Sequence, residues 1–568
     1  MCGISGLVGT GNYEFQLKRM LESQVHRGPD FTGTFFDRGF AALGHNRLSI
    51  IDLSQNANQP FNDASGRYTI VFNGEIYNYL ELKERLKHDY DFKTSSDTEV
   101  LLAAFVNYGK DCLKMLNGMF SFAIWDTLKK ELFAARDRFG IKPLYYYKDR
   151  GVFIFSSEIK AIHNIEVNRK PNETVWLNYF ANGSYGLPNE TFWEDIHQLP
   201  GGHYLELSGN QVKITKWYDF EANVNRQTKI NDYEEAKAIY KDLLIDSINL
   251  RFRADVPVGF NVSGGLDSSA LLALANVSQK DISKIEAFTF YTGDENYDEL
   301  PWVEQIIGRY KNPLNKVLLS AEEVPVLSNF VTNIQDEPFG GVPTLAYSKL
   351  FASASKKGVK VLLDGQGMDE QLAGYDYYRN NSKSTIQGVK KSPFRKNMLH
   401  SSFIDNISKN EYHLPFDSEL ENLQYRDLFY TKIPRALRFN DRVSMVHSTE
   451  LRVPFLDYRL VEFGFSLPNN FKIKNNQGKW LLRSITTDYV GSNVTYTPKR
   501  PLQTPQREWL GNELKDFVQN HIYKIKSSAY KSWFNEKEID LEWSKYLAGD
   551  NQSSFHIWQL VNFSMLST

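Results

Sequence analysis

The chain has 568 residues, in which 66 lysines and arginines face 68 aspartates and glutamates. This length exceeds one ordinary hydrophobic core and predicts at least two domains. The balanced charge excludes a general attraction to nucleic acid or an anionic membrane, and we find neither an apolar run of about 18 residues nor a signal-peptide pattern. We therefore expect a cytoplasmic protein with no nucleic-acid or membrane partner.

Short apolar runs separated by Gly, Asn, Asp and Pro characterise the chain up to about Leu207, as in CGISGLVG, YTIVFNGEIYN, MFSFAIWD and HYLEL. Such runs predict an antiparallel sheet with hairpin turns. YLELKERLKHD and TEVLLAAFVNYG have a helical period, so we expect a layered α+β domain. A polar stretch follows, and we divide the chain there into domains of residues 1–220 and 221–568.

Strands that run into glycine turns and then helices characterise the second part. PVGFNV leads into SGGLDSS and ALLALANV, KIEAFTFYT leads into PWVEQIIGRY, and VKVLL leads into DGQGMDE. This alternation predicts a doubly wound parallel α/β sheet, whose ligand sites lie at the carboxyl ends of its strands. From about residue 380 we expect mostly helices.

The chain has only two cysteines, Cys2 and Cys112, which argues against a disulfide framework. Cys112 lies among apolar positions and is expected in a core. If Met1 is removed, Cys2 carries a thiol and a free amine, and the amine can serve as the base that activates the thiol. An unreactive terminal cysteine is the alternative.

Other fragments of the first part supply groups that suit an amino acid with a side-chain amide. Arg47 could hold a carboxylate with its guanidinium fork. Asn73 and the Gly74 N–H could stabilise an oxyanion, each donor contributing roughly 3 kcal/mol. Glu75 and Asp97 could hold an α-ammonium group. Taken singly, Asn73 and Gly74 are more typical of a hairpin turn, Arg47 of the protein surface and Asp97 of a helix cap.

Two glycine turns of the second part could bind a nucleotide. SGGLDSS follows a strand and opens a helix, so its N–H groups and hydroxyls could hold phosphate, although it lacks the lysine of a Walker loop. Asp267 in this turn and Asp369 in DGQGMDE could share a Mg²⁺ ion with phosphate oxygens. Solvated acids in glycine turns are the alternative.

The order of MCGISGLVG, HRGPD, HNRLSIIDLS, FNGEIYNY, SSDTEVLL, GMFSFAIWD and ARDRFGIKPLYYY resembles the class II glutamine amidotransferases. The resemblance implies an αββα-layered Ntn-hydrolase sandwich in which Cys2 attacks the glutamine amide, and Asn73 with Gly74 forms the oxyanion hole. Arg47, Glu75 and Asp97 would bind the α-groups of glutamine. The pocket would be lined by the backbone of Leu48, Ser49, Ile50 and Ile51.

SGGLDSS resembles the pyrophosphate loop of ATP pyrophosphatases, and its order with LLDGQGMDE, RALRFNDRVSMVHSTELRVPFLDYRLVEF and QGKWLLR resembles the asparagine synthetases. This implies ATP and Mg²⁺ as cofactors, adenylation of a carboxylate, Asp267 and Asp369 as metal ligands, and Lys479 as the group that neutralises the phosphates. A homodimer is also in keeping with the resemblance. The expected ATP site comprises Val262, Ser263, Gly264, Gly265, Leu266, Asp267, Ser268, Phe290, Asp364 and Gly365.

The resemblance implies glutamine as nitrogen donor, aspartate as acceptor, and an enclosed passage for ammonia between the two sites. Amidation of another acid, such as a uronic acid sugar or a secondary-metabolite carboxylate, is the main alternative, and a catalytically idle homologue is another. A β-lactam synthetase is disfavoured because Cys2 accompanies a full set of glutamine-binding residues.

Gln366 departs from the family pattern, because asparagine synthetases carry a glutamate at this position in DGQGMDE. An amide cannot take a proton from attacking ammonia. Glu450 is a candidate substitute base, and a buried ion pair with Arg452 is the alternative. The departure leaves adenylation intact and bears on the identity of the amidated acid.

Overall fold

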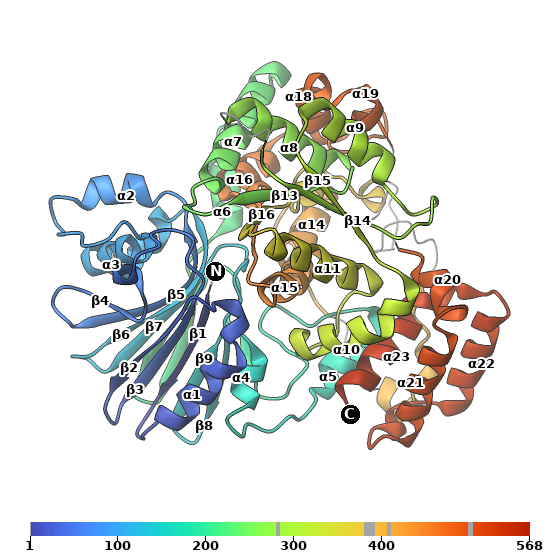
Figure 1. Ribbon diagram of the computed structural model, residues 1–568, viewed down its shortest axis with the longest axis horizontal. Coiled ribbons are helices and arrows are strands. Elements are labelled where there is room, and N and C mark those ends of the chain that lie inside the picture. The colour runs from blue at the N-terminus through green and yellow to red at the C-terminus, as the bar shows by residue number, and fades with distance from the viewer. Residues whose placement is uncertain (1, 280–283, 380–391, 406–409, 498–503, 568) are drawn as a thin grey trace.

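The computed structural model describes residues 2–279, 284–379, 392–405, 410–497 and 504–567 (Figure 1). Its first part contains two six-stranded antiparallel sheets. In spatial order, the first sheet contains β10 (His197–Gln198), β8 (Tyr145–Asp149), β9 (Val152–Ser156), β1 (Gly3–Val8), β3 (Ala41–Arg47) and β2 (Phe31–Asp37). The second contains β12 (Gln211–Lys216), β11 (His203–Ser208), β7 (Glu131–Arg136), β6 (Gly118–Asp126), β5 (Tyr68–Ile76) and β4 (Phe61–Asn62).

The two sheets pack face to face, and helices cover their outer faces. Ile4, Leu43, Val71 and Trp125 form part of the core between the sheets. Helices α1 (Glu14–Ser23) and α4 (Ile159–His163) cover the first sheet, and α2 (Tyr79–Leu86) and α3 (Asp97–Tyr108) cover the second. The expected αββα sandwich is therefore confirmed, and strands such as β1 and β6 are apolar on both sides because both of their faces are covered.

The second part contains a five-stranded parallel sheet in the order β15 (Leu314–Leu318), β14 (Ala287–Tyr291), β13 (Val258–Asn261), β16 (Val361–Leu363) and β17 (Glu450–Arg452). One face is covered by α7 (Tyr233–Arg251), α8 (Leu266–Ser278), α9 (Leu300–Tyr310) and α18 (Trp480–Val490). The other is covered by α10 (Val324–Gln335), α11 (Val342–Lys356) and α15 (Lys432–Met445). This confirms the doubly wound sheet.

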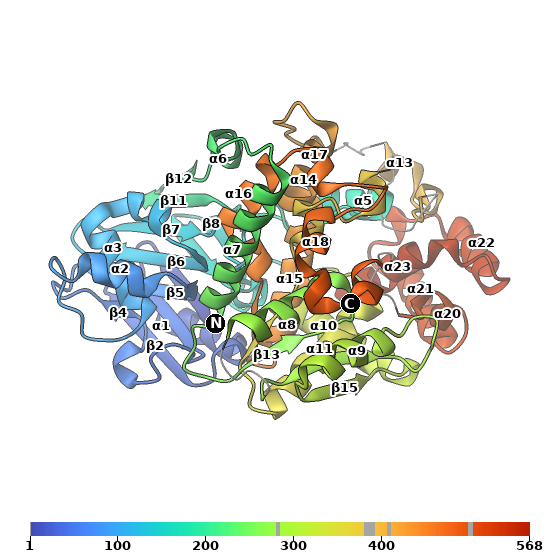
Figure 2. The same cartoon turned by 90° about the horizontal axis from the view of Figure 1, so that it is seen from above.

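The carboxyl-terminal part is helical, as expected. Besides α18 it contains α14 (Glu419–Arg426), α16 (Tyr458–Ser466), α20 (Gln506–Gly511), α21 (Lys515–Ser527), α22 (Glu536–Leu547) and α23 (Ser554–Leu566). Figure 2 shows the sandwich at one end of the molecule and α21 and α22 at the other. Within the described ranges, no helix has both the length and the apolar character needed to cross a bilayer.

Helix α5 (Glu173–Asn182) lies within the first 220 residues but packs with the second part (Figure 1). The Trp176 ring lies 4.9 Å from that of Phe563 on α23, and Gln559 of the same helix donates a hydrogen bond to the Tyr179 carbonyl. The hydrophobic core of the second part therefore includes a segment that precedes the polar stretch near residue 220.

Candidate active sites

The Cys2 side chain lies inside the sandwich, at the start of β1 and only 7% exposed. Its Sγ lies 4.0 Å from the Leu48 carbonyl oxygen, and burial raises the pKa of the thiol. Leu48, Ile50 and Ile51 are buried and Ser49 is half-buried, in the segment that follows β3. The structure thus brings the expected nucleophile and the expected pocket segment together.

Asn73 of β5 faces the Cys2 backbone. The Cys2 nitrogen donates a hydrogen bond of 3.0 Å to Asn73 Oδ1. Asn73 Nδ2 is buried and has no hydrogen-bond partner among the described residues. Gly74 has φ +155°, and a Cβ there would collide with the Met119 carbonyl of β6. A buried donor beside a thiol is the geometry that an oxyanion hole requires.

The Arg47 guanidinium is tied to the loop that follows it. Nη1 donates to the Ser54 carbonyl and to Asn58 Oδ1, both at 2.8 Å, and Nη2 donates to the carbonyls of Ile51 and Asp52. These bonds engage four of the five guanidinium hydrogens. A carboxylate would therefore meet Arg47 through Nε, unless the loop moves.

Glu75 lies near Cys2, Asp97 lies near Glu75, and both carboxyl groups are buried. Ser96 caps α3 by accepting from the Thr98 nitrogen, which puts Asp97 in the first turn, where Oδ2 accepts from the Ile76 nitrogen at 2.9 Å. Burial raises the pKa of Asp97 to about 6 and raises that of Glu75 well above its usual range. A bound ammonium group would stabilise the ionised form of each carboxyl.

Glu450 of β17 belongs to this neighbourhood rather than to a nucleotide site. Its Oε1 forms a buried ion pair with Arg452 Nε, and Arg452 Nη2 lies 3.5 Å from Glu75 Oε2. Burial opposes ionisation of Glu450, yet several nearby positive charges, the Arg452 guanidinium among them, hold its pKa low, at about 2. The ion-pair alternative is what the structure shows, and a carboxylate held ionised by such a pair is a poor proton acceptor.

A cavity of about 860 Å³ opens at the carboxyl ends of β13 and β16, which are neighbours in the sheet. Its lining includes nearly all of the expected nucleotide site: Ser263, Gly264, Gly265, Leu266, Asp267, Ser268, Asp364 and Gly365. The other two expected residues, Val262 and Phe290, line a narrow pocket that adjoins the cavity at Asn261, Ser263 and Tyr347. Ser268 Oγ accepts from the Ser263 nitrogen at 3.1 Å and so closes the loop.

Lys479 joins the two glycine turns. Its Nζ lies 2.6 Å from both Asp267 Oδ2 and Asp369 Oδ1. Burial alone would lower the pKa of Lys479, but the two carboxylates raise it above its usual value. Lys479 has φ +57°, a strained conformation for lysine, and a Cβ on Gly374 would collide with both Asp369 and Lys479. The backbone thus holds a cation against two acids at the cavity wall.

Asp364 and Gln366 of the second glycine turn also line the cavity. Asn261 donates to Asp364, and burial raises the pKa of this carboxyl to about 6. The Gln366 nitrogen donates to Asp364 Oδ1 at 3.1 Å. Gln366 Oε1 is buried without a hydrogen-bond partner among the described residues. The amide that departs from the family pattern therefore lies in the cavity lining, and its side-chain oxygen is a buried, unused acceptor.

Two family models match the chain. One is described as a glutamine amidotransferase domain and matches residues 1–218, and the other is described as asparagine synthase and matches residues 240–568. The chain belongs to the asparagine synthase family. It is therefore a glutamine-dependent ligase that uses ATP.

Similar proteins include glutamine-hydrolyzing asparagine synthetase 1 of Bacillus subtilis, which is 30% identical over 93% of this chain and 91% of its own length. Putative asparagine synthetase 2 of Methanocaldococcus jannaschii is 37% identical over 67% of this chain and 76% of its own length. Amidase chry2 of Gibberella zeae is 27% identical over 91% of this chain and 89% of its own length. Proteins with different named activities are thus similar to this asparagine synthase family member over most of its length.

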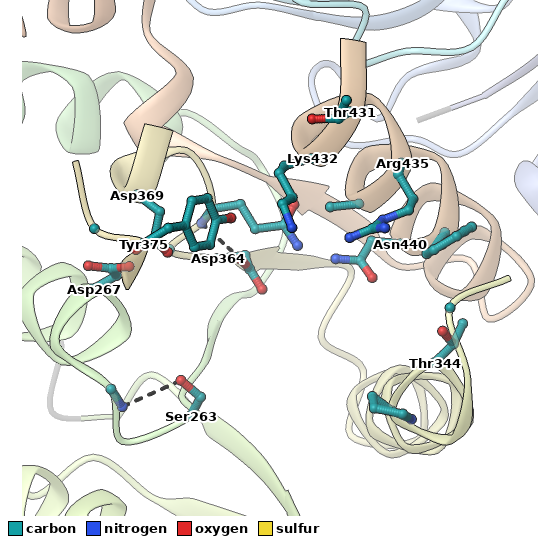
Figure 3. A pocket seen from close by; sticks show the side chains of 18 of the residues that line it. Ser263, Asp267, Thr344, Asp364, Asp369, Tyr375, Thr431, Lys432, Arg435 and Asn440 are labelled. Carbon is teal, nitrogen blue, oxygen red and sulfur yellow. Dashed lines mark hydrogen bonds between the residues drawn. The ribbon is translucent and has the colours of Figure 1, made fainter. Parts of the chain in front are cut away.

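One wall of the cavity was not expected from the sequence. Helix α15 contributes Lys432, Arg435 and Asn440, and α11 contributes Thr344 (Figure 3). Burial and the neighbouring Arg435 lower the pKa of Lys432 to about 7. KIPRALRFND has the amphipathic pattern of a half-buried helix, and its three cations, each three residues from the next, were the available sign of a charged wall.

Proposed function

We propose that this family member hydrolyses glutamine at Cys2 and uses the ammonia to amidate a carboxylate that ATP has activated by adenylation, releasing AMP and pyrophosphate. The observation that carries the proposal is the occurrence in one chain of two separate sites, the Asn73-bound Cys2 and the Lys479–Asp267–Asp369 cluster. Neither arrangement has an obvious structural purpose, because each buries polar groups at a cost in stability.

In the proposed first half-reaction, the Cys2 amine accepts the thiol proton after removal of Met1, and Sγ attacks the carbonyl carbon of the glutamine amide. The C–N bond then breaks, the amine returns the proton to the leaving nitrogen, and ammonia departs to leave a thioester. Asn73 Nδ2 donates to the developing oxyanion, while Asn73 Oδ1 orients the amine. Asp97 and Glu75 bind the α-ammonium group, and Arg47 binds the α-carboxylate. Water then releases glutamate from the thioester.

In the proposed second half-reaction, the Ser263 to Ser268 turn binds phosphate at the start of α8, where N–H groups are free of helical partners. Lys479 neutralises charge that develops on the phosphates. Asp267 and Asp369 suit Mg²⁺ because two facing carboxylates with phosphate oxygens form its usual ligand set. The ion would screen the phosphates and fix their geometry when bound.

Ammonia has to pass from one site to the other without being protonated. A buried apolar cluster joins the two halves and includes Leu48, Ile50 and Met119 from the sandwich and Val361, Leu437 and Leu456 from the second part. Ammonium is costly to bury in such surroundings, so neutral ammonia is favoured there. We propose this cluster as the region that lines the passage.

Aspartate is the first acceptor to test, because relatives of this chain are named asparagine synthetases. A different acid is the second candidate, because Gln366 offers the attacking ammonia an acceptor oxygen but cannot take its proton. The similarity to proteins named amidases is in keeping with a changed acceptor.

The test is to incubate the purified protein with glutamine, Mg·ATP and a panel of carboxylic acids, and to measure pyrophosphate, AMP and the amide product. Asparagine formation would assign aspartate, and turnover with another acid alone would assign that acid. Cys2→Ala should stop glutamine use and retain synthesis from ammonium chloride. Glutamine-dependent turnover in Cys2→Ala would overturn the nucleophile assignment, and absence of pyrophosphate release with every acid would overturn the synthetase proposal.

A further inference from the structure

The acidic residues that line the cavity of the second part all lie on one side of it. Its described lining contains four acidic residues, Asp267, Glu299, Asp364 and Asp369, and all of them come from the turns at the carboxyl ends of β13 and β16 or from the start of α9. The rest of the described lining contains no aspartate or glutamate. We call this second side, built on α15, α11 and the segment after α5, the acceptor wall.

The acceptor wall carries the cations Lys432 and Arg435, whereas Lys479, which lies on the acidic side, is paired with Asp267 and Asp369. Lys432 and Arg435 lie three residues apart on α15, and Figure 3 shows both, with Asn440, turned toward the same part of the cavity, away from Asp267 and Ser263. The Arg435 guanidinium lies 5.6 Å from the centre of the Tyr185 ring and forms no salt bridge with any described residue. A guanidinium in a cavity without a carboxylate partner is suited to bind an anion.

Two carboxylates near Lys432 already accept hydrogen bonds from tyrosine hydroxyls. Asp427 accepts from the hydroxyls of Tyr377 and Tyr378, and Glu370 accepts from that of Tyr375. Neither carboxylate lines the cavity. Their charges help to keep Lys432 protonated, whereas burial and Arg435 act against it and lower its pKa. An anion bound between Lys432 and Arg435 would relieve this repulsion.

An aspartate acceptor fits this wall poorly. Its α-ammonium group would lie beside two cations, with no carboxylate in the described lining on that side to pair with it, and burying an unpaired ammonium group is costly. A second anionic group on the acceptor would instead meet charge-assisted donors. The volume of about 860 Å³ lies near the upper end of the usual range for small-molecule pockets, in keeping with a nucleotide and an acceptor bound together.

We propose that the acceptor is an acid that carries a second anionic group and no ammonium group, and that Arg435 is the specificity-determining residue that binds this second group. The inference rests on the proposed function, because it concerns the acid that is adenylated in this cavity. The second group is a carboxylate or a phosphate, since both match the guanidinium fork.

Paired acceptors test the inference with the full-length protein, Mg·ATP and ammonium chloride, so that the first site is not needed. Succinate and aspartate differ by the ammonium group, and glucuronate 1-phosphate and glucuronate differ by the second anion. We expect pyrophosphate release to favour succinate over aspartate, the phosphorylated sugar acid over the plain one, or both. A preference for succinate identifies the second group as a carboxylate, and a preference for glucuronate 1-phosphate identifies it as a phosphate. The inference is overturned if aspartate is used as well as or better than succinate and the two sugar acids are used equally.

Variants of Arg435 separate a role in acceptor binding from a role in nucleotide binding. Arg435→Gln should raise the KM for the preferred acid roughly ten- to a hundredfold, because one charge-assisted bidentate contact is lost, and should leave the KM for ATP within about twofold. Arg435→Lys should recover part of this loss. Arg226→Gln, on an exposed arginine outside the cavity, is the matched control for lost charge. A raised KM for ATP alone would assign Arg435 to the nucleotide and overturn the inference.

A binding experiment distinguishes failure of the inference from failure of the proposed function. Calorimetry with a non-hydrolysable ATP analogue measures the affinity of the same four acids for wild type and Arg435→Gln. If no acid supports pyrophosphate release, the proposed function fails, and the inference is then judged by whether the dianionic acids bind in an Arg435-dependent way. Absence of binding by every dianionic acid overturns the inference.

Discussion

Replacing Asn73 with aspartate tests the proposed oxyanion site by changing one functional group. Asn73 uses Oδ1 to accept from the Cys2 nitrogen at 3.0 Å and holds Nδ2 as a buried donor. Aspartate has nearly the same shape and keeps the acceptor, but it replaces the donor with an oxygen. Removal of one oxyanion donor costs about 2.7–4 kcal/mol, so glutamine-dependent kcat should fall about 10²- to 10³-fold.

The assay compares glutamate release from glutamine with pyrophosphate release supported by ammonium chloride. Only the first rate should fall in Asn73→Asp, because the cavity of the second part contains no atom of Asn73. Asn73→Ala removes both contacts and should impair the first rate at least as strongly. A glutamine-dependent kcat within about tenfold of wild type in Asn73→Asp would refute the assignment, since no single oxyanion donor is that dispensable.

Three further predictions concern charged groups. Lys479→Met should abolish pyrophosphate release with either nitrogen donor and leave glutamate release intact, because Lys479 contacts only groups of the second site that we assign to ATP and Mg²⁺. The KM for glutamine should rise as the pH falls below about 6, since Asp97 has a pKa of about 6 and only its ionised form pairs with an ammonium group. Asp97→Asn should show a high KM without this pH dependence. Asp441→Asn should lower the midpoint of thermal unfolding, with a loss of roughly 1.5–3 kcal/mol, because the buried Arg27 then loses a charged acceptor; an unchanged midpoint would contradict this.

The parts of the site that follow strands were predictable from sequence. SGGLDSS and DGQGMDE each come directly after a short apolar run, and parallel strands expose their carboxyl ends at one edge. Since β13 and β16 are adjacent, Asp267 and Asp369 lie at one edge of the sheet, where both pair with Lys479. Their role as metal ligands stays a prediction. The turn residues predict the chemistry of the site, the strand–helix alternation predicts its place at the edge of the sheet, and both patterns can be seen in the sequence.

The acceptor wall and the place of the Glu450–Arg452 ion pair beside the sandwich were not predictable in this way, although the ion pair itself was one of the two alternatives for Glu450. A helical period shows which face of α15 is apolar, but not which element covers it or where Arg435 points. STELRVPFLD likewise gives no sign that β17 ends against the sandwich, where Arg452 lies between Glu450 and Glu75. Both features depend on how distant segments pack, which single-sequence patterns do not specify.

The two halves share buried charges, so the glutamine site is not a property of the sandwich alone. Arg27 donates from Nε to the Cys2 carbonyl at 3.0 Å and from Nη1 to Asp441 Oδ2 on α15 at 2.8 Å. Because α15 also carries Arg435 at its other end, one helix connects the backbone of the proposed nucleophile with the acceptor wall. A sandwich without the second part would leave Arg27 without one of its carboxylate partners and Glu75 without Arg452. Since unpaired buried charges are costly, the sequence around Cys2 is suited to a fused chain rather than to a free-standing glutaminase.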